Sequence, residues 1–125
     1  MLINFSNHPS EYWSKEQLEA AKTYGTVVDE PFPAVPPEAD EETIGKMADE
    51  CVSRLQGIIA EKNGDELSPV HIMGEMTLTF AIVDRLLKMG IKCLASTTRR
   101  EVTFDADGNK VATFRFVKFR EYMLL

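Results

Sequence analysis

Apolar residues recur along this chain with two different periods, and together these periods predict alternating strands and helices. Short apolar runs bounded by turn residues predict strands at residues 1–5, 26–32, 70–73 and 91–95. Apolar residues spaced three and four apart predict helices in the three intervals between these runs. The first strand is expected to lie in the centre of the sheet.

Capping residues support the positions of the predicted helices. Ser10 or Ser14 can cap the first helix, and Ser14 with Gln17 matches a capping box. Asp40 or Glu41 opens a long second helix, whose apolar stripe runs from residue 44 to residue 59. The third helix follows a turn at residues 74–77 and carries apolar residues at positions 78, 82, 86 and 89.

The last part of the chain predicts a β-hairpin. Two extended runs, residues 101–104 and 111–119, flank a turn with the Asp107-Gly108 pair that is typical of hairpins. Simple alternation would put Phe114 and Phe116 on one face of the second run and Val117 and Phe119 on the other. The complete order predicts a single α/β domain over residues 1–125. It is Rossmann-like and three-layered, with a mainly parallel sheet and a C-terminal β-hairpin.

Composition and charge narrow the class of protein. The chain has 125 residues and a net charge of −6, which argues against binding to duplex DNA. Residues 1–84 hold 5 basic and 16 acidic residues, whereas residues 85–120 hold 9 basic and 3 acidic ones, so a local basic patch could bind a compact anion. No signal peptide or membrane-spanning run is evident, and Cys51 and Cys93 lack metal-type spacing. We expect a cytoplasmic protein with free thiols and no membrane association.

Polar residues follow three of the predicted parallel strands, where strand ends meet at one edge of the sheet. Such hydroxyl, amide, imidazole and guanidinium groups suit ribose and phosphate. The candidate residues after the first strand are Ser6, Asn7 and His8; after the third, Gly74, Glu75, Met76 and Thr77; and after the fourth, Ser96, Thr97, Thr98, Arg99 and Arg100.

Several of these residues have a structural interpretation as well as a functional one. His8 could transfer protons or bind phosphate, or it could be a turn residue that packs on an aromatic ring. Glu75 could bind ribose hydroxyls, or it could cap the third helix, where its charge would repel a phosphate. Thr77 is first a helix-start residue. His71 fits a core position better than a ligand position. Neither histidine has a third ligand at metal-type spacing, so no metal or other cofactor is expected.

The ends of the first, third and fourth strands resemble those of the compact CRISPR-associated Rossmann-fold (CARF-like) proteins. The similarity rests on residues 4–9, 74–77 and 96–98 and on the length of the domain. This family includes stand-alone relatives of the sensor domains that bind cyclic oligoadenylates, and some members are ring nucleases that end a type III antiviral response.

The resemblance implies a homodimer that binds a cyclic oligoadenylate across its two-fold axis. It implies metal-independent cleavage in which a ribose 2′-hydroxyl attacks the adjacent phosphate, with His8, Glu75 and Arg99 as the catalytic residues. The remaining candidates would contact the ligand. Glu75 and the acidic, proline-rich loop at residues 31–42 depart from what a phosphate site requires.

Two other functions remain open on the sequence. The hairpin and the apolar C-terminal residues 122–125 could dock a partner protein or a second copy of the chain. A protein that binds an ordinary mononucleotide, including a nucleoside transferase that uses Glu75, is the other alternative.

Overall fold

The computed structural model describes residues 1–63 and 68–124 and has the predicted alternation of strands and helices. Two short 3₁₀ turns, η1 and η2, flank the first helix. The elements in chain order are β1 (Leu2–Ser6), η1 (Ser10–Tyr12), α1 (Lys15–Ala21), η2 (Lys22–Tyr24), β2 (Val27–Pro31), α2 (Glu41–Asn63), β3 (Val70–Met73), α3 (Met76–Lys88), β4 (Cys93–Phe104) and β5 (Lys110–Glu121).

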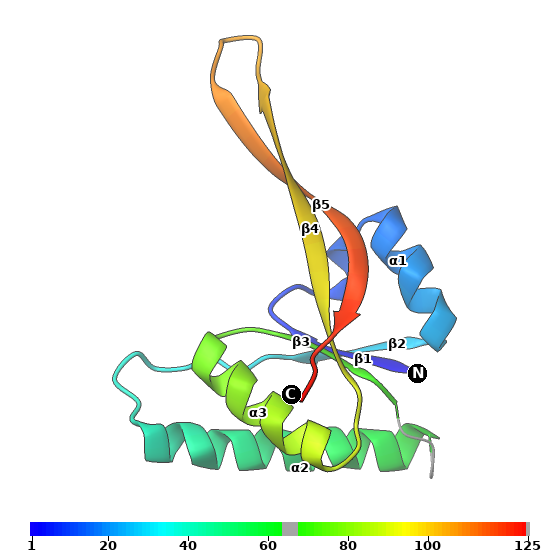
Figure 1. Cartoon of the computed structure of the whole chain (residues 1–125), viewed down its shortest axis with the longest axis vertical. Helices are drawn as coiled ribbons and strands as arrows, with labels where there is room; N and C mark the ends of the chain where they lie inside the picture. Colours follow the sequence, from blue (N-terminus) through cyan, green and yellow to red (C-terminus); the bar gives the residue numbers. More distant parts are fainter. Residues whose placement is uncertain (64–67, 125) are drawn as a thin grey trace.

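The five strands form one sheet in the order β2-β1-β3-β4-β5. β1, β2, β3 and the start of β4 are parallel, and β5 is antiparallel to β4. α1 covers one face of the sheet, and α2 and α3 lie side by side on the other (Figure 1). The predicted Rossmann-like α/β class with a mainly parallel sheet is therefore confirmed. β1 is an interior strand between β2 and β3, whereas β3 is the middle strand of the five.

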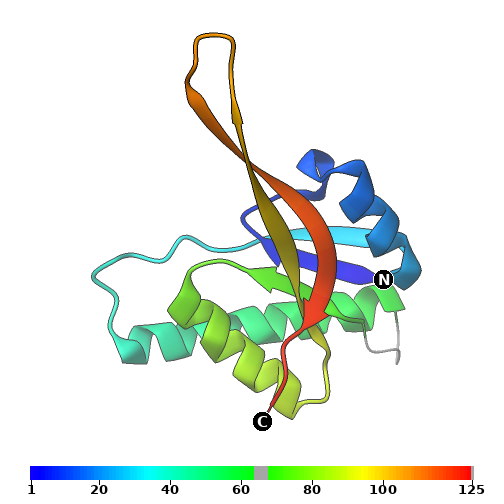
Figure 2. The same ribbon diagram turned by 45° about the horizontal axis from the view of Figure 1, so that its top comes forward.

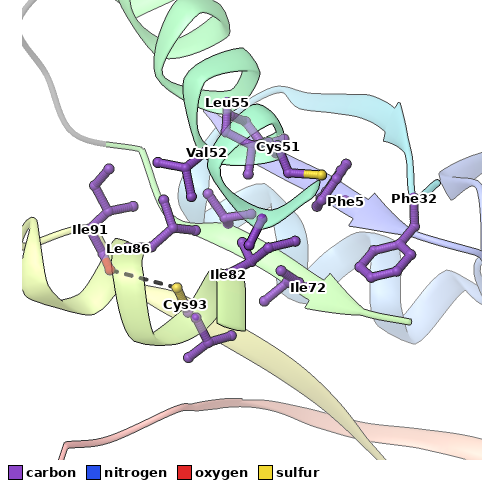
Figure 3. Close-up of a cluster of buried hydrophobic side chains, with 14 of the residues drawn as sticks. Phe5, Phe32, Cys51, Val52, Leu55, Ile72, Ile82, Leu86, Ile91 and Cys93 are labelled. Atoms are coloured by element: carbon purple, nitrogen blue, oxygen red, sulfur yellow. Dashed lines mark hydrogen bonds between the residues drawn. The ribbon is translucent and has the colours of Figure 1, made fainter. Parts of the chain in front are cut away.

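The larger apolar core lies between the sheet and helices α2 and α3 (Figure 3). Leu55, Ile72 and Leu86 are completely buried there. Cys51 and Cys93 are buried as free thiols in the same cluster, which agrees with the prediction from their spacing. Burial raises the pKa of the Cys93 thiol to about 12, so this sulfur stays protonated and is a poor nucleophile.

A smaller cluster on the opposite face joins α1 to the sheet. It consists of Leu2, Trp13, Ala21 and Leu94, with Tyr24 and Phe119 packed against it.

The predicted helix caps are present. Gln17 donates its backbone N–H to Ser14 Oγ over 3.2 Å at the start of α1, and Thr43 donates to Asp40 Oδ1 over 2.8 Å at the start of α2. Each bond satisfies a backbone donor that the first turn of a helix leaves unpaired. Ser14, not Ser10, is the cap of α1.

The prediction that the fourth strand ends at residue 95 is wrong. β4 continues without a break to Phe104, so residues 96–100 lie inside a strand and not in a loop. Serine, threonine and arginine all tolerate extended backbone, and pairing with β5 satisfies their backbone groups. Residues 97–118, which we call the arm, form a two-stranded ribbon that rises away from α2 and α3 (Figures 1 and 2).

The expected alternation of side chains along β5 is also wrong at one point. The pairing register shifts between Thr97 and Thr98, so that Thr97 pairs with Lys118 and Thr98 with Phe116. Val117 is the extra residue of this β-bulge, and it brings Phe119 to the same face as Phe116. Their ring centroids are 5.0 Å apart.

No helix within the two described segments is long and apolar enough to cross a membrane.

Candidate functional site

A cavity of about 440 Å³ opens where the sheet changes direction, at the carboxyl ends of β1 and β3. Chain segments leave these neighbouring strands toward opposite faces of the sheet, and such a point is where open α/β sheets bind their ligands. The residues that border the cavity are Ser6, Asn7, His8, Gln17, His71, Met73, Gly74 and Ser96. None of them is acidic.

Hydrogen bonds from Asn4 hold the turn that forms one wall of this cavity. Asn4 Nδ2 donates to the backbone carbonyl of His8 over 2.9 Å and to Asp29 Oδ1 over 2.8 Å. Trp13 Nε1 donates to the same carbonyl of His8 over 3.0 Å. The backbone around His8 is therefore fixed by buried groups, although its side chain is exposed.

Asn4 also determines which nitrogen of His71 carries the proton. Because Asn4 Nδ2 faces two acceptors, Asn4 Oδ1 must be the atom that lies 2.9 Å from His71 Nδ1. An amide oxygen can only accept, so His71 Nδ1 donates. His71 Nε2 then carries a lone pair, and it is buried without a hydrogen-bond partner among the described residues.

His71 stays neutral near pH 7. Burial, together with a smaller effect of the nearby His8, lowers its pKa to about 4. The ring is 2% exposed and packs edge-on against Trp13 and Phe119. The prediction of a core histidine is confirmed, but its Nε2 leaves a hydrogen-bond acceptor beside the cavity.

A larger groove of about 630 Å³ adjoins the cavity and shares His8, Gln17 and Ser96 with it. One wall comes from η1 and α1, and the opposite wall comes from the base of the arm. Exposed aromatic rings of Tyr12 and Phe114 border it. The two hollows together offer polar groups at the sheet and aromatic surfaces farther out.

The structure brings six of the predicted site residues together. Those that border the cavity or the groove are Ser6, Asn7, His8, Gly74, Ser96 and Thr98.

The residues at the start of α3 point elsewhere. Glu75 is the N-cap: its carboxylate accepts hydrogen bonds from the backbone of Leu78 over 2.7 Å and from the backbone and hydroxyl of Thr77. These bonds, first of all that from the Thr77 hydroxyl, lower the pKa of Glu75. Met76 borders a separate apolar groove with Phe80, and Thr77 borders a hollow near Asp40.

Three further candidates lie on the strands of the arm. Thr97 Oγ1 accepts from the backbone N–H of Lys118 over 3.2 Å and so holds the bulge together. Arg99 pairs with Arg115 across the ribbon, and Arg100 pairs with Phe114. None of these three residues is among those that border the cavity or the groove.

Sequence reasoning missed Asn4, Gln17 and Asp29. Asn4 stands inside an apolar run, and a buried amide at the end of a strand is a signal that could have been followed. Gln17 is buried in the first turn of α1, where we interpreted it only as part of a capping box. No sequence pattern connects Asp29 to Asn4, because only the pairing of β1 with β2 brings them together.

No group of three or more His, Cys, Asp or Glu side chains within residues 1–63 and 68–124 is arranged to hold a metal ion.

Residues 1–120 match the Uncharacterized protein MJ1673 family. The chain belongs to this family. No curated protein and no solved structure is significantly similar to it.

Proposed function

We propose that this member of the MJ1673 family binds a cyclic oligoadenylate, with one nucleotide of the ring held in the cavity at the ends of β1 and β3. The proposal rests on the resemblance to CARF-like proteins together with one observation. A neutral, buried His71 presents an Nε2 beside the cavity, and among the described residues this atom has no hydrogen-bond partner and no acidic side chain borders the cavity, on a chain of net charge −6.

The chemistry of the cavity supports a ligand with both hydroxyl and anionic groups. His71 Nε2 can accept a hydrogen bond from a ribose hydroxyl. The side-chain amides of Asn7 and Gln17 could donate to phosphate oxygens. A volume of about 440 Å³ lies within the range of small-molecule sites, and the adjoining groove adds aromatic surface for a base.

The proposal includes a homodimer in the cytoplasm. A ring of four or six adenylates repeats its own chemistry about a two-fold axis, and two copies of one cavity would match that repeat. The two buried, reduced thiols are compatible with a reducing compartment.

Ring opening at this cavity would need no metal. The 2′-oxygen would attack the adjacent phosphorus while its proton passes to an imidazole nitrogen, either of His8 or His71 Nε2. The bond from phosphorus to the 5′-oxygen would break, and that oxygen would take up a proton, which leaves a 2′,3′-cyclic phosphate and a 5′-hydroxyl. A bound phosphate would raise the pKa of His71 and so favour its role as proton acceptor.

The test uses the purified full chain with cyclic tetra-adenylate or cyclic hexa-adenylate in EDTA. Calorimetry and thermal shift measure binding, and chromatography follows linear products. We expect one ring to bind and to raise the melting temperature, and His8→Ala to weaken binding or to abolish turnover. Glu19→Ala, on the exposed surface of α1, is the control. Absence of binding by both rings would overturn the proposal.

An interaction module is the second candidate, and the apolar groove beside α3 favours it. Met76 and Phe80 are 84% and 75% exposed there. This function predicts that Phe80→Ser changes the oligomeric state or partner binding while leaving nucleotide binding unchanged, which light scattering and the titration above would measure.

A further inference from the structure

The arm rises away from the body of the domain (Figure 2), and it carries two large, exposed aromatic side chains. Phe104 is 71% exposed and Phe114 is 66% exposed. Phe114 pairs with Arg100 and Phe104 pairs with Lys110, with three pairs between them, of which one is on the same face. Alternation along the strands therefore puts both rings and both cations on the same face of the ribbon.

Two of the three acidic side chains of the arm, those of Glu101 and Asp105, are already engaged. Glu101 lies 3.6 Å from Arg115, and the Asp105 carboxylate accepts backbone hydrogen bonds from Asp107 and Asn109 in the turn. The arm contains 5 basic and 3 acidic residues. Its remaining cations are therefore available to an anionic ligand.

Four of these cations have no partner of opposite charge in the described segments. They are Arg99, Arg100, Lys110 and Lys118. Arg99 stands opposite Arg115 on the other face of the ribbon, so Arg100 and Lys110 are the cations on the face of the two rings.

We propose that the arm binds single-stranded nucleic acid, with bases stacked on Phe104 and Phe114 and phosphates near Arg100 and Lys110. Exposed aromatic rings next to cations on a β-surface are the recognition chemistry of single-stranded binders, which tolerate many sequences. Phe114 pairs with Arg100, which lies four positions before Phe104 on β4, so the two rings are about 13 Å apart along the strand. A strand of several nucleotides can cover this span, and a mononucleotide cannot.

This surface extends beyond the cavity and the groove of the proposed function, because Phe114 borders the groove but Phe104 does not. A substitution of Phe104 can therefore change nucleic-acid binding by the arm without changing the cavity or the groove. The charge of the whole chain is negative, so binding is confined to the arm and duplex DNA is not favoured.

The test measures fluorescence anisotropy of a labelled 12-nucleotide oligoadenylate, at two salt concentrations, with the full chain. We expect saturable binding that weakens as salt rises, and a loss of roughly tenfold or more in Phe104→Ala. Arg100→Ala should weaken binding and flatten the salt dependence. Val111→Ala is the matched control, because Val111 pairs with Thr103 on the opposite face of the ribbon. Circular dichroism verifies that each variant is folded.

Three outcomes would overturn the proposal. The first is the absence of binding at low salt. The second is an equal loss in Val111→Ala and Phe104→Ala. The third is a wild-type dimer that becomes monomeric in Phe104→Ala with unchanged affinity for the oligonucleotide, which would assign the arm to a second copy of the chain. The affinity of Phe104→Ala for the cyclic oligoadenylates is measured as well, because this affinity tests the cavity independently of the arm.

Discussion

The ring of Phe32 occupies the space where a β-carbon on residue 74 would stand. A Cβ built on Gly74 would lie 2.5 Å from two ring carbons of Phe32, a distance that real Cβ atoms do not show. Phe32 is buried and its ring also packs on Phe5, with centroids 5.1 Å apart (Figure 3). Gly74, which follows β3, thus lets Phe32, which follows β2, pack onto Phe5 near the end of β1.

Gly74→Ala should therefore destabilise the protein by about 1–3 kcal/mol, because the Phe32 ring must move within a packed core. Urea unfolding of the variant measures this cost. In a Phe32→Leu background, Gly74→Ala should lower the free energy of unfolding by less than it does in the wild type, because the smaller side chain removes the clash. Equal costs of Gly74→Ala in both backgrounds would contradict the explanation.

Gly57→Ala should have the opposite effect. Gly57 lies inside α2, it is exposed, and no atom is near the position of an added Cβ. Alanine favours helix over glycine by about 0.5–1 kcal/mol, so the midpoint of urea unfolding should rise. A lower midpoint would mean that this face of α2 makes contacts that alanine disturbs.

The alternation of strands and helices was predictable because it depends on local periodicity and on the caps at Ser14 and Asp40. The placement of the site was predictable only in part. Ser6, Asn7, His8 and Gly74 meet at one cavity since strand ends converge in any parallel sheet. The hydrogen bond between Asn4 and His71 spans 67 residues, and no local pattern contains it.

Asn4→Ala should destabilise the protein by about 1–3 kcal/mol and should also loosen the turn at His8. The variant leaves the Nδ1–H of His71 and the backbone carbonyl of His8 without this partner, and unpaired buried polar groups are costly. Chemical unfolding gives the free energy. Asn7→Ala, at an exposed position in the same turn, should change stability far less. Similar costs for the two variants would contradict the role of Asn4.

Stability should fall as pH drops from about 6.5 to about 4. The folded state holds His71 neutral with a pKa of about 4, whereas the unfolded chain takes up the proton near the ordinary value of 6.5. Below 6.5 the unfolded state binds more protons, so acid favours unfolding. The loss approaches about 3 kcal/mol at pH 4, given about 1.4 kcal/mol for each pKa unit.

Unfolding of the wild type and of His71→Asn between pH 4.5 and pH 7.5 checks this pH dependence. The variant lacks the titrating ring, so its stability should depend less steeply on pH, whatever its absolute value. Parallel curves for the two proteins would show that another group causes the pH dependence.

The bulge at Val117 provides the last prediction. Phe119 packs against Trp13 and His71 only because Val117 adds one residue to β5. Deletion of Val117 would restore simple alternation and turn Phe119 to the other face, away from the cluster under α1. We expect a loss of about 3 kcal/mol or more, comparable to the removal of a buried aromatic ring. Val117→Ala keeps the residue count and removes only a half-exposed side chain, so it should cost less than about 1 kcal/mol. If the two variants unfold at the same denaturant concentration, the register of β5 does not depend on the bulge.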